Sequence, residues 1–336
     1  MQSRRMRSFA HVFCRLLPVA LGIFLWSGCG RNEEAEQRTA GRLPVAARRG
    51  SIGLSVLTLT NPFFKEIADT MSREAAKHGY EVLVVSGEFD VAKQQNQVKD
   101  FIVRRVSAIV LTPCDSKAIG SAIQEASTAG IPVFTADIAC LAPGVGVICH
   151  VATDNYSGGK QAAHAMIEAL RGRGNVAILD HPEVESVLLR TKGFEEVIAA
   201  ENQTPDVAIR IVAKIPGGGV KDKSFKATED LIQAHPDLSG IFAINDPSAL
   251  GASAALEKAG KRAQIKIVGF DGQLEGKQAI KAGKIHADPI QFPDRIGAET
   301  VRVIMDHFAG KEVPKELLIP TSLYRKADAE KDPMLK

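Results

Sequence analysis

The sequence predicts an α/β protein of two lobes, each built on a doubly wound parallel sheet. The length of 336 residues exceeds what one hydrophobic core usually serves. From Ser51 onward, short β-branched runs alternate with longer amphipathic stretches, and this rhythm occurs twice. Strands that alternate with helices favour parallel sheets with right-handed crossovers.

The first set of elements lies before residue 137. Apolar runs at 51–59, 81–86, 107–112 and 131–136 are expected strands. Asn61 as cap and Pro62 in the first turn predict a helix that Gly79 ends. Asp90 is expected to begin a second helix, and Asp115 or Ser116 a third.

The second set begins after a long helix expected to start near Asp154. Its strands are expected at 175–180, 207–213, 239–245 and 264–270, each followed by a helical stretch. Two lobes of similar size follow from this repetition.

The N-terminus has the features of an export signal. Arginines precede an apolar run from Leu16 to Trp26, which is shorter than the roughly 20 residues needed to span a bilayer. Ser27-Gly28-Cys29 is similar to a bacterial lipobox, so we expect residues 1–28 to be a lipoprotein signal peptide and Cys29 to be lipidated. Trp26 departs from the lipobox pattern, and a plain signal peptide is the alternative. The polar residues 29–50 are expected to form a flexible tether.

The charge balance argues against nucleic acid as a partner. Four of the 42 basic residues lie in residues 1–28, which hold no acidic residue, so the rest carries 38 basic against 39 acidic side chains. Binding to a phosphate backbone requires a concentrated basic surface.

The cysteines and histidines indicate no metal site and no cofactor. Cys114, Cys140 and Cys149 match no zinc spacing, and the histidines are scattered. A disulfide between Cys140 and Cys149 stays open for an exported protein. The cluster Asp180-His181 with Glu183 and Glu185 is the nearest approach to a metal or acid–base site.

The residues just after the strands are the candidate ligand site, because ligands of such sheets bind beyond the carboxyl ends of the strands. Planar polar groups suit sugar hydroxyls, and aromatic rings pack on the C–H faces of a sugar. The candidates are Asn61, Phe63, Phe64, Asp137, Arg190, Asn245, Phe270, Asp271 and Gln291.

Each candidate also has a purely structural explanation. Phe63 and Phe64 fit a helix core, and Asp137 and Asn245 fit helix caps. Asp271 fits a turn before Gly272, and Arg190 fits a solvated helix position. The combined chemistry of the set favours a binding pocket.

Several motifs, in order, resemble the ribose-binding protein family of periplasmic binding proteins. The resemblance runs from about Ser51 to Leu323 and rests on TLTNPFFKEIADTMSREAAKHGYEVLV, ATDNYSGGK, AHPDLSGIFAINDPSALGA, IVGFDG and IQFPDRIGA. It implies the type I fold, in which a three-crossing hinge joins the lobes. The crossings are expected near 152–154, 289–292 and 318–321. The N-terminal lobe is then 51–152 plus 291–316, and the C-terminal lobe 153–290 plus 317–336.

The resemblance also implies roles for the candidate residues. Phe63 and Phe64 supply ring packing, and Asp137 binds a pair of hydroxyls from the first lobe. Arg190, Asn245 and Asp271 hold the ligand from the second lobe. Gln291 lies near a crossing, and Phe270 beside the sugar.

Two departures from the family bear on the ligand. Ile138 follows Asp137 where ribose binders have an arginine, and glycines in IPGGGVKD replace an aromatic residue of the second lobe. A pentose or hexose other than ribose, a cyclitol or a larger furanoside therefore stays open.

The function expected is that of a monomeric, lipid-anchored solute-binding protein of the cell envelope. It would deliver a sugar-like ligand to the permease of an ATP-driven (ABC) importer. The alternative is a sensor whose closed form is read by a membrane receptor or kinase. An enzyme is not expected, because Gly172-Arg173-Gly174 precedes a strand instead of following one, and no nucleophile elbow occurs. The export signal argues against a transcription regulator.

Overall fold

The computed structural model describes residues 49–336. The expected signal peptide, the lipidation site Cys29 and all but the end of the expected tether lie outside the described residues. Within 49–336, none of the helices is both long and apolar enough to cross a membrane.

The first sheet has six strands in the order β11-β5-β4-β3-β1-β2, and every pairing in it is parallel. Its strands are β1 (Gly50–Val56), β2 (Tyr80–Ser86), β3 (Ala108–Leu111), β4 (Val133–Ala136), β5 (Val147–Thr153) and β11 (Glu316–Ile319). Its helices are α1 (Pro62–Lys77), α2 (Val91–Val103), α3 (Gly120–Thr128) and α9 (Pro293–Phe308).

The second sheet has the order β12-β10-β9-β8-β6-β7 and is parallel except at its β12 edge. Its strands are β6 (Arg173–Asp180), β7 (Ala208–Pro216), β8 (Leu238–Ala243), β9 (Lys266–Val268), β10 (Ala287–Ile290) and β12 (Ser322–Arg325). Its helices are α4 (Asn155–Leu170), α5 (Glu185–Glu201), α6 (Lys221–Ala234), α7 (Asp246–Lys258), α8 (Leu274–Lys281) and α10 (Lys326–Ala329), followed by a 3₁₀ turn at Pro333–Leu335.

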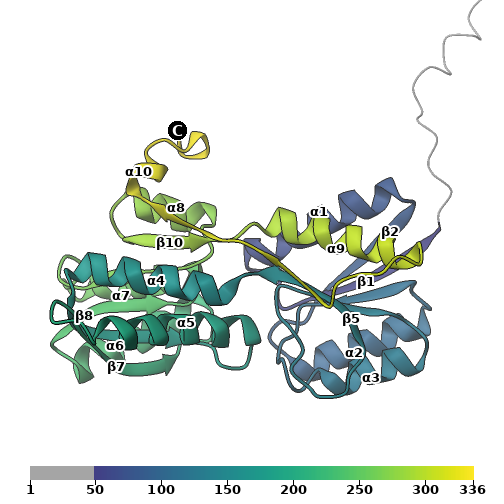
Figure 1. Ribbon diagram of the computed structural model, residues 1–336, viewed down its shortest axis with the longest axis horizontal. Coiled ribbons are helices and arrows are strands. Elements are labelled where there is room, and N and C mark those ends of the chain that lie inside the picture. Colours follow the sequence, from purple (N-terminus) through teal and green to yellow (C-terminus); the bar gives the residue numbers. More distant parts are fainter. Residues whose placement is uncertain (1–48) are drawn as a thin grey trace, which may run out of the picture. The chain divides into compact units, whose positions relative to one another are not determined.

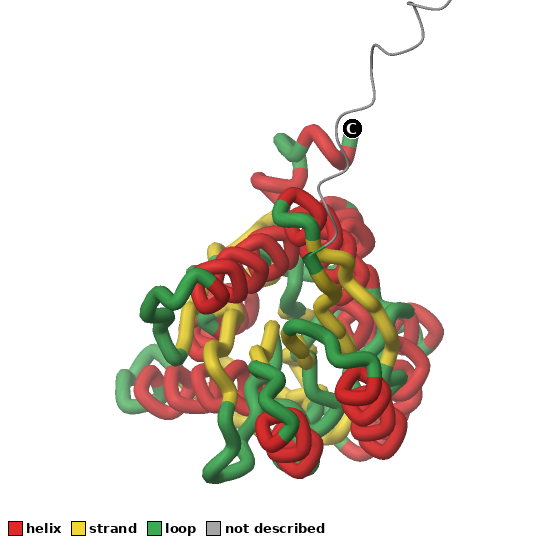
Figure 2. Tube along the Cα trace, turned by 90° about the vertical axis from the view of Figure 1, so that its right-hand side faces the viewer, coloured by secondary structure: helices red, strands yellow, loops and turns green. Residues whose placement is uncertain are grey.

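Both sheets are covered by helices on both faces, as the continuous apolar strands require. In the first lobe α1 packs beside α9, and α2 beside α3 on the opposite face (Figure 1). In the second lobe α4 pairs with α5, and α6 with α7. Figure 2 shows the strands enclosed between helices. The predicted fold class of two doubly wound lobes is confirmed.

The chain passes between the two sheets at three places. These are between β5 and α4, between β10 and α9, and between β11 and β12, where the C-terminal segment runs from one lobe to the other in Figure 1. The expected change of lobe after residue 316 needs correction. β11 pairs with β5 from Glu316 to Ile319, so these residues belong to the first sheet.

The start of α1 follows the sequence prediction closely. Asn61 is the N-cap, and its Oδ1 accepts a hydrogen bond from the Phe63 amide at 3.0 Å. Ile67 and Met71 are fully buried on the face that packs into the core. Asp90 caps α2 in the same way, with its Oδ1 accepting from the Lys93 amide at 3.0 Å.

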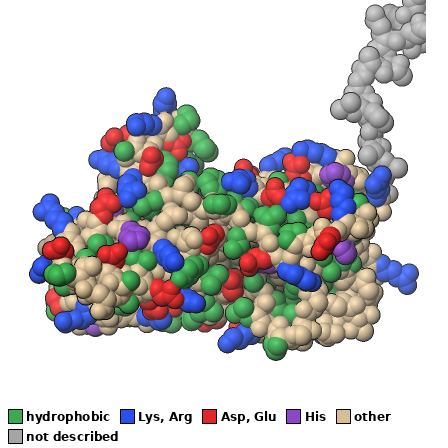
Figure 3. Space-filling model, in the orientation of Figure 1, with side chains coloured by type: hydrophobic (Ala, Val, Ile, Leu, Met, Phe, Trp, Pro, Cys, Tyr) green, Lys and Arg blue, Asp and Glu red, His purple; other side chains and the backbone are tan. Residues whose placement is uncertain are grey.

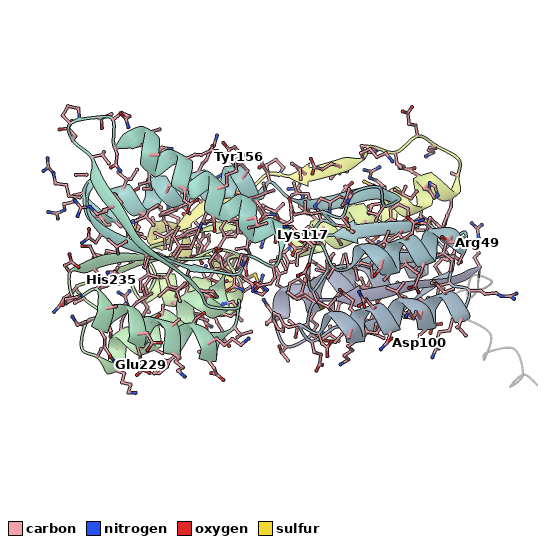
Figure 4. All side chains as sticks on the ribbon, turned by 90° about the horizontal axis from the view of Figure 1, so that it is seen from below. Arg49, Asp100, Lys117, Tyr156, Glu229 and His235 are labelled. Atoms are coloured by element: carbon pink, nitrogen blue, oxygen red, sulfur yellow. The ribbon has the colours of Figure 1, made fainter. Side chains whose placement is uncertain are left out.

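The third helix begins later than predicted. Asp115 Oδ1 accepts from the amides of Lys117 and Ala118, each at 2.8 Å, and so stabilises a turn, and α3 begins only at Gly120. Ser116 lies in this turn and faces the other lobe. Its neighbour Lys117 is labelled in Figure 4 where the lobes meet.

Candidate functional site

A cavity lies between the carboxyl ends of the strands of the two sheets. Its empty space, counted together with the part open to solvent, amounts to about 430 Å³. All the predicted ligand residues except Phe270 line it. They are Asn61, Phe63, Phe64 and Asp137 from the first lobe, Arg190, Asn245 and Asp271 from the second, and Gln291 from a crossing.

The start of α1 supplies an amide and two aromatic rings. The Oδ1 of Asn61 caps the helix, and this cap fixes the orientation of the side-chain amide. Its Nδ2 can therefore donate a hydrogen bond to a ligand. Phe63 and Phe64 pack edge to face, with ring centroids 5.3 Å apart. Both rings are buried and line the cavity, so each serves the core and the site together.

Asp137 contributes a buried carboxylate without a hydrogen-bond donor. It follows β4 in a left-handed conformation (φ 65°), held by its amide, which donates to Val151 O at 2.8 Å. The side chain is 3% exposed, and Oδ1 has no hydrogen-bond partner among the described residues. Burial raises the pKa of Asp137 to about 7, although the Arg190 charge opposes this. A ligand hydroxyl that donates to Oδ1 would remove the cost of this unpaired group.

Arg190 is fixed by three hydrogen bonds before any ligand arrives. Its Nε donates to Asn155 Oδ1 and its Nη1 to Ile244 O, both at 2.7 Å, and Nη1 also reaches Asp271 Oδ1 at 3.3 Å. The guanidinium is 3.9 Å from the ring centroid of Phe270. These contacts leave Nη2 as the part of the guanidinium fork that can bind a ligand oxygen.

Close helix packing sets the position of Arg190. α4 and α5 meet at Gly159 and Gly193, where an added Cβ would lie 2.1 Å from Arg190 O and 2.2 Å from Tyr156 O respectively. A side chain at either glycine would push α5 away from α4, and Arg190 with it.

Phe270 is placed differently from the prediction. It is completely buried, does not line the cavity, and carries the Arg190 guanidinium on its face. The ring also packs so closely on Gly158 that a Cβ added there would lie 2.5 Å from it. Phe270 therefore supports Arg190, and its expected place beside the sugar stays a prediction.

Asp271 and Gln291 form a pair at the floor of the cavity. Gln291 Nε2 donates to Asp271 Oδ1 at 2.6 Å. The backbones of the two residues are also joined, because the Gln291 amide donates to Asp271 O at 2.8 Å. Burial raises the pKa of Asp271 to about 6, while Arg190 and Gln291 act in the opposite direction. Gln291 Oε1 is buried and has no partner within residues 49–336, so it can accept a hydrogen bond from a ligand.

Asn245 joins the site through its role as the cap of α7. Its Oδ1 accepts from the Ser248 amide at 2.9 Å, and its Nδ2 donates to Gly219 O at 3.0 Å. Asn245 therefore caps α7 and lines the ligand cavity at the same time.

The two departures from the family both fall on the cavity wall. Ile138 is 2% exposed and lines the cavity, so an apolar surface stands beside Asp137. Gly219 lines it from the second lobe, with φ +66°.

Two aromatic residues of the cavity were not among the predicted ligand residues. Phe89 follows β2 and His181 follows β6, and their rings meet edge to face at 6.1 Å across the lobes. His181 Nδ1 is 3.0 Å from Glu183 Oε2, its Nε2 has no partner among residues 49–336, and burial lowers its pKa. The rule that ligands lie beyond strand ends would have selected both.

Two other kinds of site were considered in the sequence, a metal site and a disulfide, and both can be examined in the described part of the chain. No group of three or more His, Cys, Asp or Glu side chains there could hold a metal ion. Cys114, Cys140 and Cys149 are free, so the Cys140–Cys149 bridge left open in the sequence is not formed. Acidic and basic side chains are interspersed over the face shown in Figure 3.

The lobes, their crossings and the enclosed polar cavity define a two-lobe ligand-binding protein. Residues 52–312 match the family model described as "Periplasmic binding protein domain", and the chain belongs to this family. The resemblance stated from the sequence motifs is thereby confirmed.

Relatives and solved structures agree with this assignment. The chain is 35% identical to the ribose import binding protein of Salmonella typhimurium over 80% of this chain and 88% of the relative. It is 35% identical to the D-apiose import binding protein of Paraburkholderia graminis over 81% and 86%. A solute-binding protein of Actinobacillus succinogenes with bound D-allose superimposes with a TM-score of 0.77 at 28% identity, covering 84% of this chain and all of the other.

Proposed function

We propose that this chain is the solute-binding protein of an ABC importer, and that it binds a monosaccharide or sugar-like ligand between its lobes. The observation that carries this is the convergence of Asp137 Oδ1 and Gln291 Oε1, both buried and unpaired, on a cavity that also receives Arg190. Each such group left unpaired costs about 1–3 kcal/mol, so the site favours a ligand with several hydroxyls.

The names of the relatives support this ligand class. The proteins reported above are a ribose import protein, a D-apiose import protein and a solute-binding protein holding D-allose, and all three ligands are sugars. Two of these names specify import, which favours an importer over a sensor as the partner.

The proposed mechanism is closure without chemistry on the ligand. A ligand that contacts both Asp137 on one lobe and Arg190 on the other stabilises the closed state by its differential affinity. The closed lobes then present a surface that a permease recognises. We further propose that the protein acts as a monomer in the periplasm or cell envelope, anchored through Cys29.

The test is a binding screen of the chain without its first 30 residues against pentoses, hexoses and cyclitols. A ligand at 100 times its dissociation constant adds about 2.7 kcal/mol of stability, which a thermal shift detects. One sugar should give a saturable shift that Asp137→Ala and Arg190→Ala abolish, whereas Arg210→Ala on the exposed part of β7 should leave it intact. Absence of a shift with every sugar would contradict the proposal.

A further inference from the structure

A second hollow adjoins the ligand cavity. It encloses about 1140 Å³ including the space open to solvent. We call it the vestibule and define it by Thr60 and Pro62 of the first lobe and by Pro247, Leu250 and Leu274 of the second. It lies between the start of α1 and the starts of α7 and α8.

The vestibule is continuous with the ligand cavity. Asn61, Phe89 and Gly219 line both spaces. Gly219 stands at the junction, where an added Cβ would come 3.3 Å from Asn245 Nδ2, and Gly218 and Gly219 both have positive φ. A glycine here leaves the junction open, and its conformation is one that a larger residue adopts only with strain.

The accessible surface of the vestibule is mostly apolar, although Lys221, Asp246, Gln273 and Glu275 also line it. Leu274 is 49% exposed at the first position of α8, and Pro62 and Pro247 line the vestibule from the starts of α1 and α7. Phe89 is 36% exposed and holds a left-handed backbone (φ 60°), which is rare for a bulky residue. Exposed apolar surface and local strain that persist together beside a ligand site indicate a binding role.

The structure points to an aglycone subsite: we propose that the natural ligand is a sugar linked to an apolar group, and that this group occupies the vestibule. The sugar part binds Asp137, Arg190 and Asp271 in the cavity, and the apolar part passes Gly219 and packs on Phe89, Leu250 and Leu274. We assign the vestibule to a part of the ligand because Asn61, Phe89 and Gly219 line both the vestibule and the ligand cavity, so the two spaces are continuous. This inference rests on the proposed function.

The experiment compares free sugars with their glycosides on the chain lacking its first 30 residues. Pentoses and hexoses are titrated calorimetrically beside their methyl and phenyl glycosides in both anomeric forms. For the sugar that binds, one phenyl glycoside should bind at least about tenfold more tightly than the methyl glycoside, because the ring buries apolar area.

Variants assign the gain to the vestibule. Leu274→Ser and Leu250→Ala should each reduce the preference for the phenyl glycoside at least about threefold and leave the affinity for the free sugar unchanged. Leu274 is exposed, so its replacement leaves the core intact. Leu188→Ser, at an exposed leucine of α5 outside the vestibule, should change neither affinity.

The outcomes separate this inference from the proposed function. If a free sugar binds but every phenyl glycoside binds equally or less tightly, the aglycone subsite is refuted and the sugar-binding function stands. If the preference exists but survives both leucine variants, the vestibule is not its source and the inference fails. If neither sugars nor glycosides bind, the proposed function itself is refuted.

Discussion

Arg190 has the most constrained side chain of the site. Its guanidinium is shared among Asn155, Ile244 O and Asp271 and lies on the ring of Phe270, with the whole residue 3% exposed. A point charge alone cannot replace it, because the partners are arranged for a planar fork.

We therefore expect Arg190→Lys to weaken ligand binding strongly, although the lysine retains the positive charge. The lysine ammonium cannot serve Asn155, Ile244 O and the ligand together, so ligand affinity should fall by about 100-fold or more. Stability should fall by about 2–4 kcal/mol, because buried acceptors lose their donors. Calorimetric titration and urea unfolding measure the two effects, with Arg210→Lys on exposed β7 as the matched control. Near-normal affinity in Arg190→Lys would show that charge, and not the fork, is what the site uses.

At the scale of elements, α5 receives its cap from the opposite lobe. Its N-cap residue Val184 provides no side-chain bond to the helix, and the Glu185 amide donates instead to Ser116 Oγ at 2.9 Å. The Ser116 amide donates to Glu183 O at 3.0 Å, and the Ala139 amide reaches Glu185 Oε2 at 3.4 Å. Because α5 also carries Arg190, lobe closure completes the helix that binds the ligand.

Ser116→Ala should weaken ligand binding although Ser116 does not line the cavity. A helix cap contributes about 1 kcal/mol, and this one exists only when the lobes meet, so the dissociation constant should rise about fivefold. Selectivity among sugars should not change. Titration of Ser121→Ala, an exposed serine of α3, gives the comparison. Equal affinities in the two variants would mean that Ser116 contributes nothing to closure.

At the scale of the whole molecule, the second lobe holds two buried acidic side chains outside the ligand cavity, and one of them, Asp246, also lines the vestibule. Asp246 and Asp288 are both buried, and among the described residues no partner hydrogen-bonds Asp246 Oδ1 or either carboxyl oxygen of Asp288. The neighbouring Asp288 adds to the rise in the pKa of Asp246. Burial raises the pKa of Asp288 to about 7, and the pKa of Asp246 well above its usual range. Glycines enclose both carboxyls, since a Cβ at Gly269 would lie 2.5 Å from Asp288 Oδ1 and one at Gly276 2.0 Å from Asp246 Oδ1.

Stability should therefore fall as the pH rises through about 7. The unfolded Asp has a pKa of about 3.9, so between that value and the folded one the native state binds more protons, and the free energy of unfolding declines with pH. For one proton, the decline of the unfolding free energy approaches about 1.4 kcal/mol per pH unit. The decline ends once the pH exceeds the folded pKa and the native state has lost that proton.

Asp288→Asn tests the source of this dependence. The amide keeps the shape of the side chain and removes one of the two buried titrating carboxyls, so the fall in unfolding free energy from pH 6 to pH 8 should become shallower. Urea unfolding of the unliganded protein at several pH values measures it, and Asp230→Asn on the exposed side of α6 should keep the original slope. A slope that Asp288→Asn leaves unchanged would assign the effect to other groups.

The doubly wound lobes, the caps at Asn61 and Asp90, and the choice of strand-end residues as the site were predictable from the order of the amino acids. These features depend on local periodicity and on a rule of topology, both of which are written in consecutive residues. The prediction for each ligand contact stays a prediction until a ligand is bound.

The tertiary structure alone decided which of those side chains face the cavity. It turned Phe270 beneath Arg190, brought Phe89 and His181 together across the lobes, and made Ser116 the cap of a helix in the other lobe. It also placed β11 beside β5, although 166 positions separate Glu316 from its partner His150. β5 begins at Val147, in a stretch without a clear strand pattern. Contacts of this kind join residues far apart in the chain, and no local pattern specifies them, because they arise only when the two sheets and their helices have packed.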